Sequence, residues 1–415
     1  MSANPKVSVC IPSYNHAKYL PATIESVLRQ TFQDFEIVIV DDGSSDDSLR
    51  IAQEYAAQYP SVIRVYTHPN HSNRGISATV NLAFEKSKGT YWSGLSSDDL
   101  LYPEKLAHQV AYLESHPNVG WVYTYTTFID DEGHELPGVF GTDITKERNP
   151  IERLIENNLI AGMTVLARRK CVEKVGRHEE GLIYSDWDFW VRMVVACKVG
   201  VLPYPLVKWR SHGSNASFGV DPKVNIARGL EVMASLQQKA SSIGGDLVKP
   251  RTQALIFLQK AFLFFGAGDM AAASQSLAAA FKIDPSLLES TEYFVQWLQA
   301  RRHERWILPL IQNRLTGCDF GNWILAQLPT ITGRPLSKRL LRQVKGAEFA
   351  HKAFESYQDK NLKRTRQMAI RCLMDDPHWI TNRHLLGVLG KSLVGSRVIA
   401  KVRQVKELLS TLKAG

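Results

Sequence analysis

Long apolar segments and paired cysteine motifs are both missing from this chain of 415 residues. No apolar run approaches the roughly 20 residues that a helix needs to span a bilayer. The five cysteines, at positions 10, 171, 197, 318 and 372, lack the spacing of a metal site and leave one over, which is typical of a reducing compartment. The first residues lead straight into a strand-forming run without a signal-peptide pattern. We therefore expect a cytoplasmic protein.

Two glycine-rich motifs that bind phosphate groups are also absent. The sequence has no Gly-x-Gly-x-x-Gly after its first predicted strand and no Gly-x-x-x-x-Gly-Lys-Ser/Thr at any position. Neither a dinucleotide fingerprint nor a P-loop is therefore expected. If this chain binds phosphate groups, their charge must be met by a metal ion or by basic side chains.

Alternating strand and helix patterns fill the first hundred residues. Four short apolar runs are predicted to be strands: residues 6–11, 35–40, 62–66 and 91–95. Three stretches with apolar residues at helical spacing are predicted to be helices: residues 19–30, 46–55 and 76–86. Strands and helices that alternate in this way indicate an α/β fold with a mainly parallel sheet.

Two acidic pairs, Asp41-Asp42 and Asp98-Asp99, each follow a predicted strand. Ligands of parallel sheets bind where the carboxyl ends of neighbouring strands open into one crevice. Carboxylates at two such ends can bind a divalent cation and the polar edges of a nucleotide. The pairs therefore predict a nucleotide-diphosphate site in which Asp98 and Asp99 are the metal ligands. The alternative is that these acidic loops only cap helices.

Several ordered motifs resemble one known family. They are Val7-Ser-Val-Cys-Ile-Pro-Ser-Tyr-Asn-His-Ala-Lys-Tyr-Leu20, residues 26–44 ending in Asp-Asp-Gly-Ser, residues 73–81, and Leu95-Ser-Ser-Asp-Asp-Leu-Leu-Tyr-Pro-Glu-Lys-Leu106. In this order they resemble the inverting glycosyltransferases of family 2, which have the GT-A fold. The resemblance covers roughly residues 5–215. It is specific because several motifs follow one another in the same order as in the family.

The resemblance implies a nucleotide-sugar donor. Four residues match positions that contact the nucleoside in the family: Pro12, Tyr14, Asn15 and Asp42. A carboxylate can accept the N–H of the base, and a tyrosine ring can stack on it. A UDP-sugar is the expected donor, and GDP- and dTDP-sugars are not excluded. Arg74 is the basic residue expected near the diphosphate.

The metal-binding pattern departs from the family at one position. Ser96 stands where the usual Asp-x-Asp motif has its first carboxylate, which leaves Asp98 and Asp99 for Mn²⁺ or Mg²⁺. A serine is a weaker ligand, so we expect modest metal affinity. Downstream, Trp209-Arg210-Ser-His212 resembles an Arg-x-His element of the family, and His212 is a candidate for metal or phosphate binding.

The resemblance places the catalytic base at Asp186. In the family the base lies in a Glu-Asp-x-Asp-Leu-Trp-x-Arg stretch, and this chain reads Tyr184-Ser-Asp-Trp-Asp-Phe-Trp-Val-Arg192. Ser185 replaces the usual Glu. Trp187 and Trp190 are suited to the apolar wall of a pocket, which would raise the pKa of a carboxyl. The alternative is that Asp186 caps the helix that follows it.

The second half of the chain has helical periodicity without strand signals. We expect a transferase domain over residues 1–220 and an all-α domain over 221–415. An internal repeat at an offset of 92 residues aligns Lys260–Pro285 with Lys352–Pro377. Each copy resembles a tetratricopeptide-type hairpin, at about 252–288 and 344–380. Because only two copies are clear, the sequence is equally consistent with a short helical bundle and with a solenoid.

Positive charge is concentrated near the C-terminus. Residues 301–415 contain 22 Lys and Arg against 8 Asp and Glu, a net charge of +14, whereas the whole chain carries +9. Basic helices of this kind could contact the anionic inner face of the membrane, where lipid-linked acceptors reside. A solvated helical face is the alternative. Nucleic-acid binding is not expected, because no recognised motif accompanies the charge.

The leading functional hypothesis is inverting transfer of a sugar to a glycan or lipid-linked glycan in cell-surface polysaccharide biosynthesis. A second hypothesis is that the chain is a nucleotidyltransferase, but the glycine-rich loop that is usual in such enzymes is absent. A degenerate transferase that acts as a scaffold through its helices is a third reading, prompted by Ser96 and Ser185. The presence of Asp98, Asp99 and Asp186 argues against it.

Overall fold

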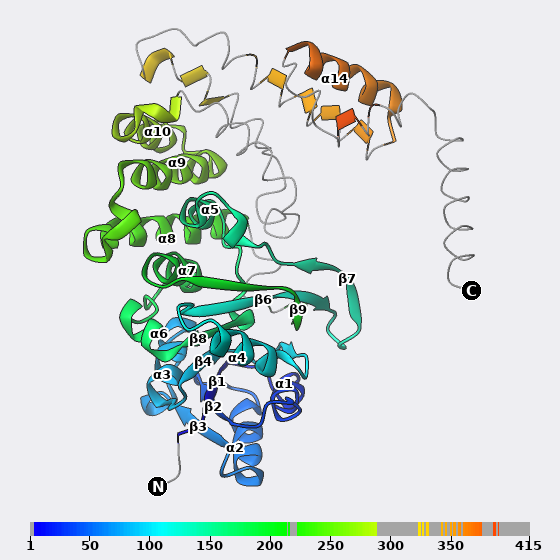
Figure 1. Ribbon diagram of the computed structural model, residues 1–415, viewed down its shortest axis with the longest axis vertical. Helices are drawn as coiled ribbons and strands as arrows, with labels where there is room; N and C mark the ends of the chain where they lie inside the picture. The colour runs from blue at the N-terminus through cyan, green and yellow to red at the C-terminus, as the bar shows by residue number, and fades with distance from the viewer. Residues whose placement is uncertain are drawn as a thin grey trace, which may run out of the picture. The chain divides into compact units, whose positions relative to one another are not determined.

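The computed structural model describes residues 4–213, 215, 222–288, 360–375 and separate positions between 323 and 389. The chain forms two compact units, residues 1–267 and 268–415, and each is described by itself. The first unit contains a nine-stranded sheet with helices packed against it (Figure 1). The second unit is helical where it is described.

The sheet has the strand order β3-β2-β1-β4-β8-β6-β9-β5, and β7 pairs with β6. The strands are β1 (Val7–Ser13), β2 (Phe35–Asp41), β3 (Ile63–Thr67), β4 (Tyr91–Gly94), β5 (Leu100–Leu101), β6 (Trp121–Ile129), β7 (Glu135–Phe140), β8 (Val165–Arg168) and β9 (Val199–Arg210). Six strands run in one direction, and β5, β7 and β8 run against it. The predicted α/β fold with a mainly parallel sheet is confirmed.

The first unit has nine described α-helices. They are α1 (Leu20–Leu28), α2 (Ser48–Gln58), α3 (Ile76–Lys86), α4 (Lys105–Ser115), α5 (Pro150–Glu156), α6 (Arg169–Val175), α7 (Ser185–Ala196), α8 (Pro222–Ile243) and α9 (Pro250–Ala267). Every residue of β2 is buried, as expected for a central strand covered on both faces. Helix α3 packs against β1 and β2, and α4 packs against β6, β8 and β9.

The register of the parallel strands places three loops at one edge of the sheet. Ser13 at the end of β1 lies opposite Asp41 at the end of β2. On its other side β1 pairs with β4, which ends at Gly94. The segments that follow these strands therefore emerge together, and they include both acidic pairs.

Strand β9 brings a fourth segment to the same place. It pairs with β6 along its length, and near its end Lys208 lies opposite Leu100 of β5. Because β5 follows Asp98-Asp99 directly, the end of β9 lies beside the second acidic pair. Residues far apart in sequence are in this way brought to one site.

Helices α8 and α9 belong to the first compact unit, which ends at Ala267. The division expected near residue 221, between a transferase domain and an all-α domain, stays a prediction. Helix α8 packs on α7, and α9 packs on α5 and α8 (Figure 1). Asp188 of α7 is completely buried and forms an ion pair with Arg192 at 2.7 Å. Its carboxylate also accepts a hydrogen bond from Ser235 of α8 and lies 3.4 Å from Lys239.

The second unit contains two well-described helices, α10 (Met270–Ile283) and α14 (Leu362–Asp375). Asp269 caps α10 by accepting a hydrogen bond from the backbone N–H of Ala272. Helix α14 contributes Ala369 and Cys372 to a small apolar cluster. The hairpins expected at 252–288 and 344–380 remain a prediction, because positions between 344 and 359 and residues 376–380 of the second copy lie outside the described residues. The same holds for most of the basic segment 301–415 and its expected membrane contact.

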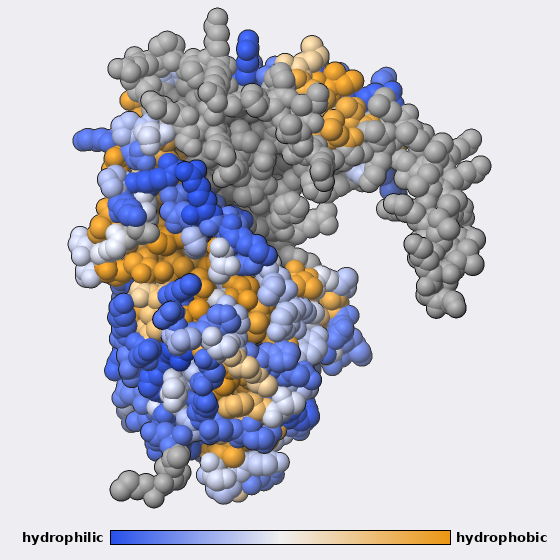
Figure 2. All heavy atoms as spheres, viewed as in Figure 1, coloured by the Kyte–Doolittle hydropathy of each residue, from blue (hydrophilic) through white to orange (hydrophobic). Residues whose placement is uncertain are grey.

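Within the described part of the chain, no helix is both long and apolar enough to cross a membrane. Hydrophilic residues predominate on the face of the first unit shown in Figure 2, and hydrophobic residues gather mainly near α7 and α8.

We predict that Asp188→Ala destabilises the first unit by about 3–5 kcal/mol, because it leaves the buried Arg192 guanidinium without its carboxylate partner. Urea unfolding monitored by tryptophan fluorescence measures the change, since α7 itself carries Trp187 and Trp190. The matched control is Glu179→Ala, which removes the half-exposed partner of Lys239 and should cost less than about 1 kcal/mol. Equal effects of the two variants would contradict a structural role for Asp188.

Candidate active site

Hydrogen bonds between side chains and backbone hold the strand-end loops together. The side-chain oxygen of Asn15 accepts a hydrogen bond from the backbone N–H of Ser45 at 2.8 Å. The backbone N–H of Asn15 donates to the hydroxyl oxygen of Ser44. Asp42 accepts from the backbone N–H groups of Arg74 and Gly75 at 2.7 and 3.0 Å. The loops after β1 and β2 and the start of α3 therefore form one connected surface.

The loop after β2 needs a glycine at its turn. Gly43 has a φ of +74°, and a Cβ at this position would lie 2.5 Å from the carbonyl oxygen of His71. Asp41 supports the turn by accepting from the backbone N–H groups of Gly43 and Ser44 with Oδ2. Its Oδ1 is buried without a hydrogen-bond partner. A buried carboxylate oxygen with no partner marks a place where a donor on a ligand could bind.

The residues predicted to contact the nucleoside lie at this edge and differ in exposure. Asp42 is 4% exposed and its two oxygens hold the loop before α3. The ring of Tyr14 is 46% exposed, which leaves a face for stacking. Pro12 is partly buried, and Asn15 has a positive φ of 51°. The exposed side chain of Arg74 lies 3.9 Å from Glu180.

Adjacent Asp98 and Asp99 have different environments. Oδ2 of Asp98 lies 2.9 Å from Nε2 of His212 and accepts a hydrogen bond from Asn215. Asp99 is 1% exposed and its Oδ1 accepts from the backbone N–H of Arg210 at 2.8 Å. Burial and the neighbouring Asp98 carboxylate raise the pKa of the Asp99 carboxyl well above its ordinary value. The structure thus brings together Asp98 and His212, whereas Asp99 holds the end of β9.

The side chain of Arg210 also holds the end of β9 beside the acidic pair. Its Nε donates to the carbonyl oxygen of Asp98 at 2.8 Å. One terminal nitrogen donates to the carbonyl oxygens of Asp130 and Asp131 at 3.1 and 3.0 Å. The guanidinium also lies over the ring of Tyr19. Arg210 therefore links the acidic pair, the turn after β6 and the first helix.

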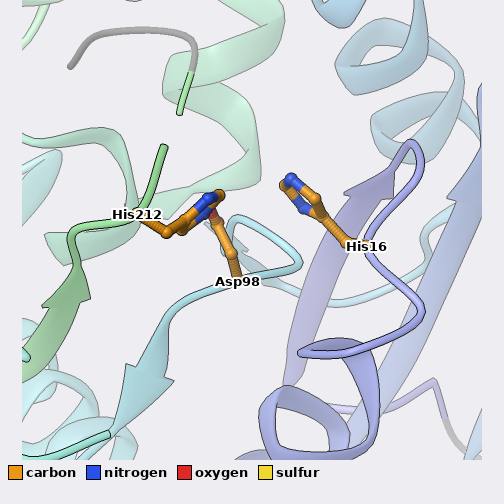
Figure 3. A group of neighbouring side chains, drawn as sticks. All are labelled: His16, Asp98 and His212. Atoms are coloured by element: carbon orange, nitrogen blue, oxygen red, sulfur yellow. The ribbon is translucent and has the colours of Figure 1, made fainter. Parts of the chain in front are cut away.

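Three side chains from different strand ends offer ligand atoms that lie within 4.8 Å of one another: His16, Asp98 and His212. They converge from the loops after β1, β4 and β9 (Figure 3). Burial lowers the pKa of the His16 ring, although the nearby Asp98 acts in the opposite direction. Neutral imidazole and ionised carboxylate are the ligand forms of these groups. The set therefore fits a divalent cation.

Asp186 lies in the first turn of α7 and has contacts of its own. Its Oδ2 accepts a hydrogen bond from Nδ2 of Asn158 at 3.0 Å, and Oδ1 accepts from the backbone N–H of Trp187. Burial raises the pKa of the Asp186 carboxyl, and the bond from Asn158 offsets part of the rise. A carboxylate with a raised pKa is a stronger base. The N-cap of α7 is Tyr184, so Asp186 lies inside the first turn and is not the cap of its helix. Its carboxylate can accept a proton.

The segment before α7 is fastened to α3. Asn81 forms a reciprocal pair of hydrogen bonds with the backbone of His178, at 2.9 and 2.8 Å. Ser77 donates to the carbonyl oxygen of Leu182. Helix α3 starts at the loop that Asp42 holds, so the same helix positions both the donor-side loop and the approach to Asp186.

His16, Asn158, Arg210 and Asn215 were not singled out as site residues from the sequence. Arg210 and Asn215 lie within three residues of His212, so a closer reading of that stretch could have found them. His16 lies inside a motif that carries the family resemblance, but its proximity to Asp98 depends on how two loops fold. Asn158 lies 28 residues before Asp186 in the sequence, so its contact with that carboxylate depends on the fold.

Comparisons with known proteins agree on one family. Residues 8–176 match the family described as glycosyl transferase family 2. The putative glycosyltransferase EpsE of Bacillus subtilis is 37% identical over 196 residues, 46% of this chain and 68% of that protein. An uncharacterized glycosyltransferase of Rickettsia prowazekii, RP339, is 32% identical over 218 residues, 52% of this chain and 66% of that protein. The matches therefore span about two thirds of these relatives and about half of this chain.

A solved structure supports the fold. S. aureus TarS 1–349, crystallised in complex with UDP-GlcNAc, is similar over 79% of this chain and 92% of that chain, with a TM-score of 0.52. The sequence identity is 17%, so this likeness bears on the fold alone.

We predict that Asp98→Asn weakens Mn²⁺ binding by about tenfold or more, because it removes the carboxylate beside His212. Asp99→Asn should leave Mn²⁺ affinity within a few-fold, since an amide oxygen can still accept the N–H of Arg210. Electron paramagnetic resonance of free Mn²⁺ gives both affinities, and thermal melting checks that each variant is folded. A larger loss in Asp99→Asn than in Asp98→Asn would make Asp99 the metal ligand.

Proposed function

Because the chain belongs to glycosyl transferase family 2 and has the GT-A fold, we propose that it transfers a sugar from a nucleotide-diphosphate donor to a hydroxyl group of a glycan or lipid-linked glycan, with inversion. The observation that carries the proposal is the Asp98–His212 pair at the strand ends where the other predicted donor-site residues lie. The cellular setting that we propose is synthesis of a cell-surface polysaccharide.

The nucleoside end of the donor would bind over the loops after β1 and β2. Tyr14 offers an exposed ring for stacking on the base. Oδ1 of Asp41 is a buried acceptor without a partner, and it would suit an N–H of the base. Asp42 would act on the same part of the donor, directly or through the loop that it holds. A uracil base presents an N–H between two carbonyl groups, so a UDP-sugar is the proposed donor.

The diphosphate would lie near Asp98, His212 and Arg74. A divalent cation held by Asp98 and His212 would neutralise charge that develops on the leaving diphosphate. The side chain of Arg74 is exposed at the start of α3 and can turn toward a phosphate group. The hydrogen bonds between Arg210 and the Asp98-Asp99 pair would hold Asp98 and the end of β9 in fixed relative positions while the donor binds.

The acceptor end would be activated by Asp186. Its carboxylate would take the proton of the acceptor hydroxyl as the oxygen attacks the anomeric carbon from the face opposite the diphosphate, which inverts that centre. Partial burial makes the Asp186 carboxylate more basic than an exposed one. Asp188 is unsuited to this role, because it is completely buried and its oxygens contact Arg192, Ser235 and Lys239.

We predict that UDP binds the full chain about tenfold or more tightly with Mn²⁺ than in EDTA, a difference of about 1.4 kcal/mol. The reason is that the described phosphate side of the site offers side chains that can hold a cation, Asp98 and His212 among them, and the exposed Arg74. Isothermal titration calorimetry measures both affinities. Tyr14→Ala should weaken UDP binding under both conditions, whereas Tyr59→Ala, at an exposed residue after α2, serves as the control. Equal UDP affinity with Mn²⁺ and in EDTA would remove the metal from the proposal.

We predict that Asp186→Asn lowers the turnover of transfer by about 10²–10⁴-fold, the usual range for loss of a general base. The substitution keeps the size of the side chain and removes its basic oxygen. UDP affinity should stay within a few-fold of the parent, because the donor-side contacts are made by other residues. Turnover close to that of the parent would assign the base to another residue.

The pH dependence of transfer should shift when Asn158 is replaced. Activity requires the ionised carboxylate, so it rises as the pH increases through the pKa of Asp186. Asn158→Ala removes a hydrogen bond that favours the charged form, so the pKa rises further and the acidic limb of kcat/KM moves to higher pH. Asn158→Asp, which adds a second carboxyl, should move it in the same direction. If the acidic limb of the profile does not move in either variant, the ionisation that controls activity does not belong to Asp186.

A further inference from the structure

Ser96 leaves the cation site one carboxylate short of the family pattern. Its side chain lies close enough to Asp99 to act on the pKa of that carboxyl in the lowering direction. Asp98 then supplies the carboxylate and His212 supplies a ring nitrogen, 2.9 Å apart. Two protein ligands hold a divalent cation weakly, so a third donor is expected nearby.

His16 occupies the position of that donor. A ligand atom of its ring lies within 4.8 Å of ligand atoms of both Asp98 and His212. The ring comes from the loop after β1, across from the other two residues (Figure 3). Its edge-on contact with the ring of His212, at a centroid distance of 5.7 Å, shows that both imidazoles belong to the same small space.

A contact with a neighbouring hydroxyl group orients the His16 ring. Nδ1 lies 2.7 Å from the hydroxyl oxygen of Ser97, next to Asp98 in sequence. The backbone N–H of His16 donates to Ser48 at 2.9 Å, which fixes its main chain. Metal-binding histidines commonly use one ring nitrogen for such a bond and the other for the metal.

We propose that Nε2 of His16 is the third protein ligand of the cation, so that this site selects Mn²⁺ or Co²⁺ over Mg²⁺. Two imidazoles with one carboxylate suit first-row transition metals, whereas Mg²⁺ prefers oxygen ligands in octahedral geometry. The proposal rests on the proposed function only for the role of the cation. It makes the histidine after β1 a determinant of metal choice.

The test is cation binding by the full chain without nucleotide. Electron paramagnetic resonance of free Mn²⁺ gives the affinity, competition with Mg²⁺ gives the selectivity, and the visible absorption of Co²⁺ reports nitrogen ligation. The parent should bind Mn²⁺ about tenfold or more tightly than Mg²⁺. His16→Ala should lose about tenfold or more in Mn²⁺ affinity and change the Co²⁺ spectrum, with a smaller effect on Mg²⁺.

Two further variants separate ligation from folding. His16→Asn keeps a polar group that can bond Ser97, so it should match His16→Ala in metal binding while its thermal melting stays close to the parent. Ser96→Asp in the His16→Ala background should restore cation binding with a greater tolerance for Mg²⁺. His116→Ala, at an exposed histidine beside Tyr112, is the control and should bind Mn²⁺ like the parent.

Three results would overturn the proposal: unchanged Mn²⁺ affinity in His16→Ala and His16→Asn, no preference for Mn²⁺ over Mg²⁺ in the parent, or no cation binding at millimolar concentration. None of these depends on a sugar donor. If the metal results are as expected but no nucleotide sugar is consumed, the proposed function fails and the His16 ligand stands. If sugar is transferred but His16→Ala binds Mn²⁺ like the parent, the reverse holds.

Discussion

The hydrogen bond from the backbone of Arg210 to the buried carboxyl of Asp99 is the contact on which the site depends. It joins the end of β9 to the segment after β4, two places 111 residues apart in the sequence. The Arg210 side chain strengthens the junction by donating to the carbonyl oxygen of Asp98. With these two segments fixed, Asp98 and His212 lie within hydrogen-bond distance. The cost of burying Asp99 is reduced if it is protonated, in keeping with its raised pKa.

The other acidic residues acquire different properties from their surroundings. Asp98 has a histidine and an amide beside it, which suits a metal ligand. Asp186 has one amide partner and a pKa that burial raises, which suits a proton acceptor. Asp188, two residues further on, is fully paired and joins α7 to α8. Carboxyl groups of the same kind can therefore serve metal binding, proton transfer and stability within one compact unit, because burial and partners differ.

Local patterns predicted much of the fold and less of the site. The helix expected at 76–86 is α3, and the strand expected at 62–66 is β3, shifted by one residue. The acidic pairs were correctly placed at strand ends, since a parallel sheet brings such ends together. Sequence order could not show that Asp98 and Asp99 point to different partners, or that His16 approaches them. It also could not show that α8 joins the first unit, because the contacts of Ser235 and Lys239 with Asp188 are long-range.

The most direct test of the account is to incubate the full chain with a panel of nucleotide sugars and Mn²⁺ and to identify the nucleotide released. Transfer to an acceptor, or to water at a slower rate, should release a nucleoside diphosphate from one donor and leave the others intact. Asp98→Asn should abolish this release under the same conditions. Release of a nucleoside monophosphate or of pyrophosphate would indicate a different reaction at the same strand ends. If no donor is consumed and none binds, the claim that this site transfers sugars is contradicted.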